Sequence, residues 1–150
     1  MKIEKATLED ARGMRDLVSI YAKEEKMLPR SLSSIYESIR EYFVIRDGEN
    51  ILGTCGLHVY WLDMAEVRSL AIHPHYVKKG LGTKLVRACL REAKKMGIKK
   101  VFTLTVAPKF FNKLGFKKID ANKLPMKVWG ECVNCPKFMD CDETAMQVEL

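Results

Sequence analysis

The sequence contains no long hydrophobic run. A membrane-spanning helix needs about 18 or more consecutive apolar residues, and no segment of the chain approaches that length. The first twenty residues alternate charged and apolar side chains and lack the apolar stretch of a secretion signal. We therefore expect a cytoplasmic protein with no membrane partner.

Cysteine is scarce and odd in number, with five residues in 150. An odd count without a secretion signal argues against a disulfide framework. Three of the five form a C-terminal cluster, Cys132, Cys135 and Cys141, whose spacing suits one half of a zinc site. A fourth ligand is not evident. Free thiols are the favoured interpretation, and zinc or a disulfide formed on oxidation are the alternatives.

Repeats, low-complexity runs and Pro/Ser-rich linkers are also missing. Hydrophobic residues make up 47% of the chain. A chain of this length buries about two-thirds of its unfolded surface and needs no disulfide or metal to fold. We interpret residues 1–150 as one domain, with an irregular Cys-containing segment at about residues 124–143.

Basic charge is concentrated in one part of the chain. The net charge is +7, but residues 77–118 hold thirteen Lys/Arg against one acid, Glu92, so this window carries +12 and the remainder −5. Such polarity predicts a polyanionic partner: nucleic acid, a membrane surface or a phosphorylated cofactor, with a solvated basic face as the plain alternative. A nucleic-acid site would need exposed aromatic residues among the lysines. The phenylalanines of this window lie in core-like runs, so we expect no nucleic-acid partner.

What is present is an alternation of strand and helix patterns. Period-two alternation and β-rich runs predict strands, and apolar spacings of three and four predict helices. Residues 47–50 have the composition of a hairpin turn, and Gly97 supplies a helix stop. This order predicts an α/β fold. The expected strands cover residues 2–6, 42–46, 51–61, 66–72, 101–106, 116–119 and 144–150, and the expected helices cover residues 7–21, 31–39, 80–96 and 108–114.

Residues 73–83 join an expected strand to the best-defined helix. Unpaired backbone N–H groups and the helix dipole make such a junction an anion site. Gly80 and Gly82 leave the main chain accessible, and three nearby lysines add positive charge. The alternative is a tight turn that needs glycine. The loop lacks the Gly-Lys-Ser/Thr of a nucleoside-triphosphate site and the third glycine of a dinucleotide site.

Three ordered motifs occupy residues 67–74 (VRSLAIHP), 76–82 (YVKKGLG) and 110–116 (FFNKLGF). In this order and spacing they resemble the GNAT superfamily of N-acetyltransferases, and the resemblance extends over essentially the whole chain. It implies the GNAT acyl-CoA N-acyltransferase fold, a mixed, mostly antiparallel sheet of six to seven strands flanked by about four helices. It also implies acetyl-CoA as the co-substrate.

The resemblance further assigns contacts to the cofactor. The main chain of Leu70, Ala71 and Ile72 would pair with the extended pantetheine arm in the manner of an added strand. Asn112 would lie near the sulfur end of the coenzyme. The pyrophosphate would be held by the backbone amides of Lys78, Lys79, Gly80, Leu81, Gly82 and Thr83.

Two positions depart from the family pattern. Val77 stands where the family usually has Arg or Gln. We expect weakened rather than lost pyrophosphate binding, because main-chain amides make most of the contacts. Phe111 stands where the family commonly has a tyrosine general acid, and phenylalanine cannot donate a proton.

A closer resemblance concerns residues 28–31 (LPRS) and 124–132 (LPMKVWGEC). Both segments are similar to those of short, single-domain bacterial N-acetylglutamate synthases. This implies transfer of an acetyl group to the α-amine of L-glutamate, the first step of arginine biosynthesis. The alternative is a GNAT acetyltransferase that acts on another amine, such as another amino acid, a polyamine or a protein N-terminus.

An amino-acid ammonium must lose a proton before it attacks a thioester. Glu66 is the candidate base, with an ordinary exposed strand-end acid as the alternative. A backbone N–H near Leu70 would stabilise the oxyanion. The two carboxylates of glutamate need cationic partners, for which Arg30 and Arg68 are the first candidates and Lys127 a weaker third; each could instead be a surface charge.

Other nucleophiles and bases fit less well. His73 precedes a proline, a position more typical of a turn cap than of a catalytic base. Cys89 falls on the apolar stripe of a helix and Cys55 in a buried-looking strand. We therefore expect direct attack on the thioester without an acyl-cysteine intermediate. A homodimer is an open alternative to a monomer.

Overall fold

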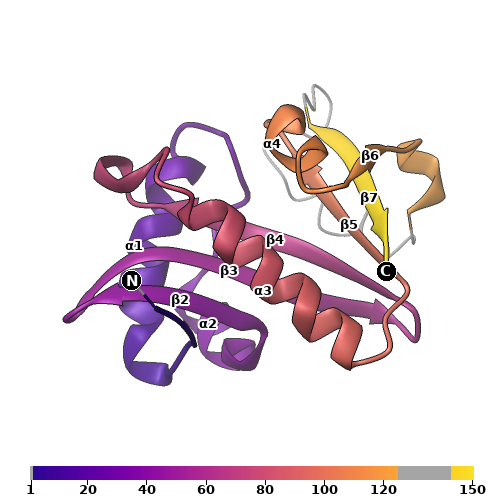
Figure 1. The fold of residues 1–150 in the computed structure, drawn as a ribbon. Coiled ribbons are helices and arrows are strands. Elements are labelled where there is room, and N and C mark those ends of the chain that lie inside the picture. Colours follow the sequence, from indigo (N-terminus) through magenta and orange to yellow (C-terminus); the bar gives the residue numbers. More distant parts are fainter. Residues whose placement is uncertain (1, 125–142) are drawn as a thin grey trace.

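The computed structural model describes residues 2–124 and 143–150, which form one mixed sheet in the order β1-β2-β3-β4-β5-β7-β6 (Figure 1). All neighbouring strands pair antiparallel except β4 and β5, which are parallel. The predicted mixed, mostly antiparallel sheet is confirmed. The strands are β1 (Ile3–Lys5), β2 (Tyr42–Asp47), β3 (Asn50–Trp61), β4 (Met64–Ile72), β5 (Lys100–Thr105), β6 (Lys117–Lys118) and β7 (Thr144–Glu149).

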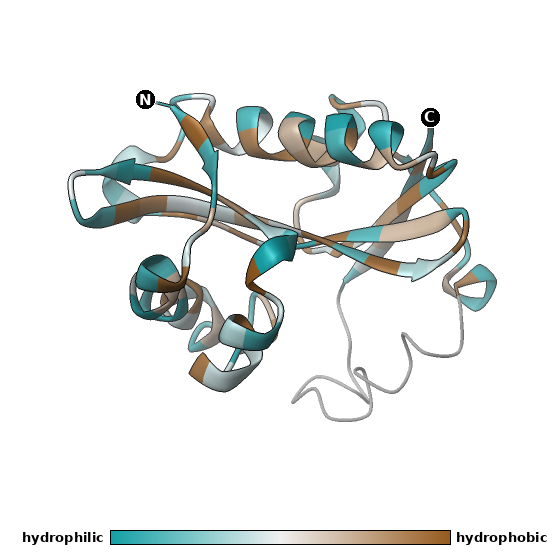
Figure 2. Cartoon of the chain, turned by 90° about the horizontal axis from the view of Figure 1, so that it is seen from below, coloured by the Kyte–Doolittle hydropathy of each residue, from teal (hydrophilic) through white to brown (hydrophobic). Residues whose placement is uncertain are grey.

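Helices cover both faces of this sheet. The long helix α3 (Leu81–Lys95) packs on one face of strands β1 to β4. Helices α1 (Ala11–Ala22) and α2 (Leu32–Glu37) lie on the opposite face, as the edge-on view in Figure 2 shows. The short helix α4 (Pro108–Asn112) contacts β6 and β7. Within the described residues no helix is long and apolar enough to cross a membrane.

The alternation of side chains along the strands divides the apolar core between these two faces. On β2, Ile45 belongs to the core beneath α3, whereas Val44 belongs to the core beneath α1 and α2. Helix α3 contributes Leu85, Val86 and Cys89, each fully buried. Its opposite, charged side faces solvent, so the apolar periodicity of this segment reports a true amphipathic helix.

The ends of the helices follow local signals in the sequence. The backbone N–H of Thr7 donates to Asp10 (2.7 Å), and the hydroxyl of Ser31 accepts from the N–H of Ser34 (3.0 Å). Gly97 ends α3 with φ +81°. The helix predicted at residues 108–114 ends earlier, at Asn112. The chain turns at Gly115 (φ +95°), and the hydrogen bonds from the N–H groups of residues 114 and 115 span three residues instead of four.

Candidate functional site

Strands β4 and β5 share only a short ladder. Their pairing runs from Met64 opposite Lys100 to Glu66 opposite Phe102, and the strands then separate (Figure 1). At the point of separation the hydroxyl of Thr103 donates to the carbonyl of Val67 at 2.9 Å. The parallel ladder therefore ends in a fork whose open side is bounded by the second half of each strand.

A β-bulge lies on the β4 side of this fork. The register with β3 passes from Gly56 opposite Arg68 to Thr54 opposite Ala71, so two β4 residues stand opposite one residue of β3. Ser69 takes up the extra residue in a left-handed conformation (φ +55°). Serine has a side chain that this conformation disfavours, so the surrounding packing must hold the bulge in place.

The register also decides which backbone groups face the opening. The N–H of His73 donates to the carbonyl of Leu52 at 2.7 Å, which makes this a hydrogen-bonded pair of the β3–β4 ladder. Antiparallel ladders alternate between hydrogen-bonded and non-hydrogen-bonded pairs. The backbone N–H and C=O of Ala71 are therefore directed toward Thr54, and those of Ile72 are directed away from β3. With the bulge before it, Leu70 follows Ile72 toward the opening.

A groove of about 660 Å³ fills the fork and continues to the N-terminus of α3. This volume suits a ligand of cofactor size. Parts of α1, β4, β5, α4 and the loop before α3 contribute to its walls. Its lining comprises Tyr21, Lys26, Met27, residues 67–72, Tyr76, Val77, Lys78, residues 80–83, residues 103–107, Phe110, Phe111 and Lys113.

The loop before α3 has the backbone of an anion site. Lys78 (φ +63°) and Gly80 (φ +79°) both adopt left-handed conformations, which turn successive N–H groups to one side. Helix α3 begins directly afterwards with its unpaired amides at the groove. Gly82 has a different role, because a Cβ there would lie 3.3 Å from Cζ of Phe110, so the glycine permits close packing of α3 on α4.

Charged side chains gather on the α1–α2 side of the bulge. Nε of Arg30 donates to the hydroxyl of Ser69 at 3.3 Å. The two guanidinium nitrogens of Arg68 each lie 3.7 Å from a carboxylate oxygen, one of Glu66 and one of Glu41. The fork thus has Arg30 and Arg68, the two arginines singled out in the sequence, close to the same backbone segment, and their contact with a substrate stays a prediction.

Glu66 itself is a buried carboxylate, with 6% of its surface exposed. The hydroxyl of Tyr60 donates to it at 3.4 Å. The alternative of an exposed strand-end acid is therefore wrong. A buried carboxylate beside an arginine and a tyrosine is the setting in which acid–base groups are found, although structural ion pairs share it.

Phe111 is buried in an aromatic cluster at the α4 side of the groove, where it packs edge to face against Phe110 and Phe116. The departure from a tyrosine at this position is thus compatible with the core, and no hydroxyl stands there. Asn112 does not line the groove; its amide donates to the carbonyl of Phe116 at 3.4 Å. A contact of Asn112 with the coenzyme stays a prediction.

Several expectations concern the cysteines and the C-terminal segment. Cys55 and Cys89 are buried with their sulfurs 3.7 Å apart, and the hydrogen bond between them, together with burial, raises the pKa of Cys55 well above its ordinary value. A protonated buried thiol is a poor acyl acceptor. Lys127, Cys132, Cys135 and Cys141 lie outside the described residues, and the part of the chain that is described contains no metal-binding group of His, Cys, Asp or Glu.

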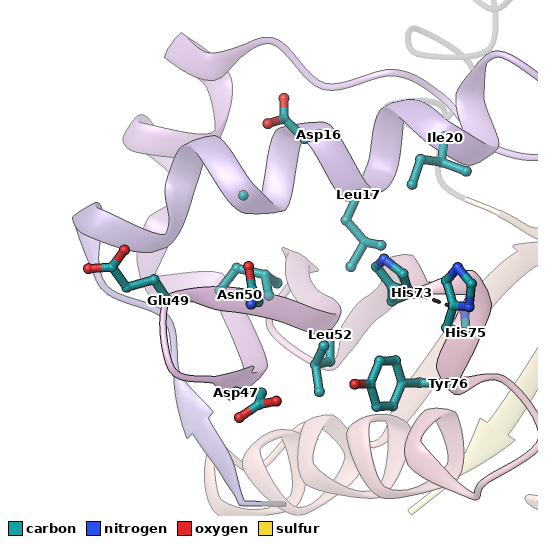
Figure 3. A pocket seen from close by; sticks show the side chains of 12 residues that line it. Asp16, Leu17, Ile20, Asp47, Glu49, Asn50, Leu52, His73, His75 and Tyr76 are labelled. Atoms are coloured by element: carbon teal, nitrogen blue, oxygen red, sulfur yellow. Dashed lines mark hydrogen bonds between the residues drawn. The ribbon is translucent and has the colours of Figure 1, made fainter.

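A second cavity, of about 690 Å³, lies between α1, the β2–β3 turn and the turn that follows β4 (Figure 3). Its walls include Asp16, Asp47 and Glu49, so it is poorly suited to phosphate groups. His73 forms one side of it, and its Nδ1 accepts from the N–H of His75 at 3.2 Å. The role of His73 as a turn cap is confirmed.

Two residues of the groove were not found from the sequence. Tyr21 lies near the end of α1 and donates a hydrogen bond from its hydroxyl to the carbonyl of Ile72. Thr103 lies on β5 and bonds to β4 as described above. Tyr21 fits the apolar stripe of α1, so periodicity alone assigns it to the core. Thr103 shares β5 with a second hydroxyl residue, Thr105, so the sequence pattern does not single it out.

Sequence comparisons relate this architecture to known proteins. Residues 9–116 match a family model described as Acetyltransferase (GNAT) family. An uncharacterized N-acetyltransferase from Chlorobaculum tepidum is 38% identical over 144 residues, which cover 96% of this chain and 93% of that protein. An amino-acid acetyltransferase from Mycobacterium tuberculosis is 29% identical over 132 residues, covering 86% of this chain and 75% of that protein.

Solved structures share the fold over the full chain. A Mycobacterium tuberculosis protein in complex with CoA and NLQ superposes with a TM-score of 0.84 at 26% identity, and the match covers 100% of this chain and 99% of that chain. The N-acetylglutamate synthase of Neisseria gonorrhoeae, complexed with coenzyme A and N-acetyl-glutamate, superposes with a TM-score of 0.90 at 20% identity. That match covers 99% of this chain but 35% of the longer enzyme, and at this identity it speaks for the fold alone.

Proposed function

The chain belongs to the GNAT family of acetyltransferases, and on that premise we propose that it transfers the acetyl group of acetyl-CoA to the α-amine of L-glutamate. The observation that carries this proposal is the pair of arginines at the β4 bulge. Arg30 bonds to Ser69, and Arg68 is the residue directly before Ser69 on β4. An acceptor with two carboxylates suits two guanidinium groups beside the site of acetyl transfer.

The groove fits acetyl-CoA by its chemistry. Its open β4 edge offers the backbone of Leu70 and Ile72 to an extended amide chain, as a sheet edge does to an added strand. The loop from Lys78 to Thr83 offers amides and a helix N-terminus to a pyrophosphate. Acetyl-CoA supplies an activated thioester to this site.

Residues of the chain then act on the acceptor. Glu66 takes the proton of the ammonium group, directly or through a water, because only the neutral amine is nucleophilic. The N–H of Leu70 donates to the carbonyl oxygen as negative charge develops on it. Phe111 supplies no proton, so protonation of the leaving thiolate falls to solvent at the open groove. Cys55 and Cys89 take no part, since both are buried in the core.

Similarity to amino-acid acetyltransferases also supports an amino-acid acceptor. A reaction of this kind on L-glutamate begins arginine biosynthesis, and we place the protein there. Lys127 remains a proposed third cation for the acceptor. Lys26 also lines the groove, where its ammonium group pairs with the carboxylate of Glu24 at 2.8 Å.

The test is an assay of coenzyme A release. Purified protein is mixed with acetyl-CoA, with and without L-glutamate, and the free thiol is followed with a thiol reagent. Glutamate-dependent release is the expected result. Release that depends instead on a polyamine or a peptide N-terminus would reassign the acceptor, while the family membership would stand.

A further inference from the structure

Side-chain hydroxyls occupy two β4 carbonyls, one at each end of the open edge. At the fork, Thr103 of β5 donates to the carbonyl of Val67 at 2.9 Å. At the other end, Tyr21 of α1 donates to the carbonyl of Ile72. Both donors line the groove and come from elements that flank β4. The two contacts therefore bound one short stretch of strand edge.

The contact at the fork replaces a ladder bond. Phe102 is the last β5 residue in register with β4, so a continued ladder would bring the β5 main chain to Val67. The hydroxyl of Thr103, which is 3% exposed, takes that carbonyl instead. A hydroxyl can satisfy a buried carbonyl without adding another residue of strand pairing. The fork thus opens at a defined residue.

At the far end, the hydroxyl of Tyr21 is the donor and the carbonyl of Ile72 is the acceptor. Burial raises the pKa of Tyr21 above its ordinary value, so the phenol stays protonated at neutral pH and acts as a donor. Ile72 is directed toward the groove by the alternation of the ladder, and its carbonyl is therefore on the edge that an extended ligand would use.

Between these contacts lies the bulge with Leu70. An extended amide chain added to a uniform edge can slip along it, because each step offers similar donors and acceptors. Carbonyls that already accept a hydroxyl are weaker acceptors for a ligand amide than the carbonyl of Leu70. We infer that the hydroxyls of Tyr21 and Thr103 act as two stops that set the register of the pantetheine arm on β4.

Tyr21 and Thr103 are thus positioning residues, because they act through the backbone of β4. Register matters here because a shift of one residue would carry the thioester away from the N–H of Leu70. The inference rests on acetyl-CoA as the donor and not on the identity of the acceptor. Its test can therefore be a binding measurement without any acceptor, and it remains valid if L-glutamate is not the substrate.

The experiment compares two ligands by isothermal titration calorimetry: acetyl-CoA, and 3′-phosphoadenosine 5′-diphosphate, which has the phosphates but no pantetheine arm. The variants are Tyr21→Phe, Thr103→Val and Thr103→Ser. Loss of either hydroxyl is expected to lower the affinity for acetyl-CoA about fivefold to tenfold. The affinity for 3′-phosphoadenosine 5′-diphosphate is expected to change less than about twofold. Thr103→Ser keeps the hydroxyl and is expected to bind acetyl-CoA like the parent protein.

Matched controls remove a hydroxyl elsewhere. Tyr36→Phe changes a 39% exposed tyrosine on α2, and Thr54→Val changes a buried threonine whose hydroxyl has no partner among the described residues. Neither is expected to alter affinity for acetyl-CoA. Three results would each overturn the inference. The first is an equal loss of affinity for both ligands, and the second is unchanged affinity for acetyl-CoA in Tyr21→Phe and Thr103→Val. The third is a Thr103→Ser protein that binds acetyl-CoA as weakly as Thr103→Val.

Discussion

Arg30 and Ser69 are 39 residues apart in the chain, yet Nε of the arginine lies 3.3 Å from the serine hydroxyl. Ser69 is the left-handed residue of the β4 bulge, and its hydroxyl is directed to the side of the sheet that carries α1 and α2. The cofactor groove opens at the same bulge. The contact therefore links two parts of the proposed site. One is the segment before α2, which we assign to the amine substrate, and the other is the edge of β4, which we assign to acetyl-CoA.

Replacement of Arg30 tests the acceptor side of this link. Arg30→Ala is expected to lower kcat/KM for L-glutamate about 10²-fold, because a guanidinium–carboxylate contact is lost, while the KM for acetyl-CoA changes by less than about twofold. Steady-state kinetics with each substrate varied in turn measure both effects. Arg12→Ala, which removes an exposed arginine of α1, serves as the control. An Arg30→Ala protein with parental kinetics would exclude this residue from the acceptor site.

Glu66 is expected to act as a base and also touches Arg68, so its two roles must be separated. If it takes the proton, Glu66→Gln lowers kcat by about 10²-fold or more and removes the loss of rate on the acidic side of the pH profile. If Glu66 only holds Arg68, the KM for L-glutamate rises and kcat is preserved. A pH profile of kcat and KM for the variant and the parent distinguishes the two, and the second pattern would refute the base.

The carboxylate of Asp10 is expected to make the stability of the protein depend on pH. This carboxylate bonds to Arg46 through two oxygens, at 2.8 Å each, and these bonds hold the pKa of Asp10 below its ordinary value. Because the folded pKa is depressed, the stabilisation is present above about pH 4 and is lost as the pH falls through the folded pKa. Asp10→Asn should lower the free energy of unfolding by about 2 kcal/mol near neutral pH.

Urea titrations at several pH values measure this difference. The gap between the parent protein and Asp10→Asn is expected to narrow below about pH 4. Asp16→Asn provides the control, since Asp16 is 70% exposed in its pair with Arg15 and such pairs contribute little. A gap that stays constant through the acid range would contradict the assigned pKa.

Much of the fold was predictable because local signals agree with the tertiary structure. The apolar stripe of α3, its glycine stop at Gly97 and the hairpin turn at residues 47–50 each predict the observed element. The position of the loop between β4 and α3 was predictable for the same reason, and binding of the cofactor by residues 73–83 stays a prediction.

The details that shape the site depend on contacts between distant residues, and these have no local signal. The bulge falls on Ser69, although glycine or asparagine would be the residue expected in a left-handed conformation. Tyr21 looks like one more member of an apolar stripe, yet it bonds to Ile72. The sequence left Glu66 equally compatible with an exposed acid, because its burial follows from how β3 and α1 pack against β4.

The two glycines of the cofactor loop are expected to respond differently to alanine. Gly80 has φ +79° with open space where a Cβ would be, so Gly80→Ala should cost about 1 kcal/mol of stability through backbone strain. Gly82 has ordinary helical geometry, so Gly82→Ala should cost less, although the ring of Phe110 must shift. Thermal and urea unfolding rank the two variants. The opposite order would show that packing against Phe110 dominates over strain at Gly80.

Acceptor identity is the central claim, and a competition experiment tests it most directly. The protein is given acetyl-CoA with an equimolar mixture of amino acids, polyamines and a peptide with a free N-terminus, and the acetylated products are identified by mass spectrometry. We predict N-acetylglutamate as the main product, with kcat/KM for L-glutamate at least about tenfold above that for L-glutamine, which lacks the second carboxylate. An acetylated polyamine or peptide as the main product, with no N-acetylglutamate, would contradict the account.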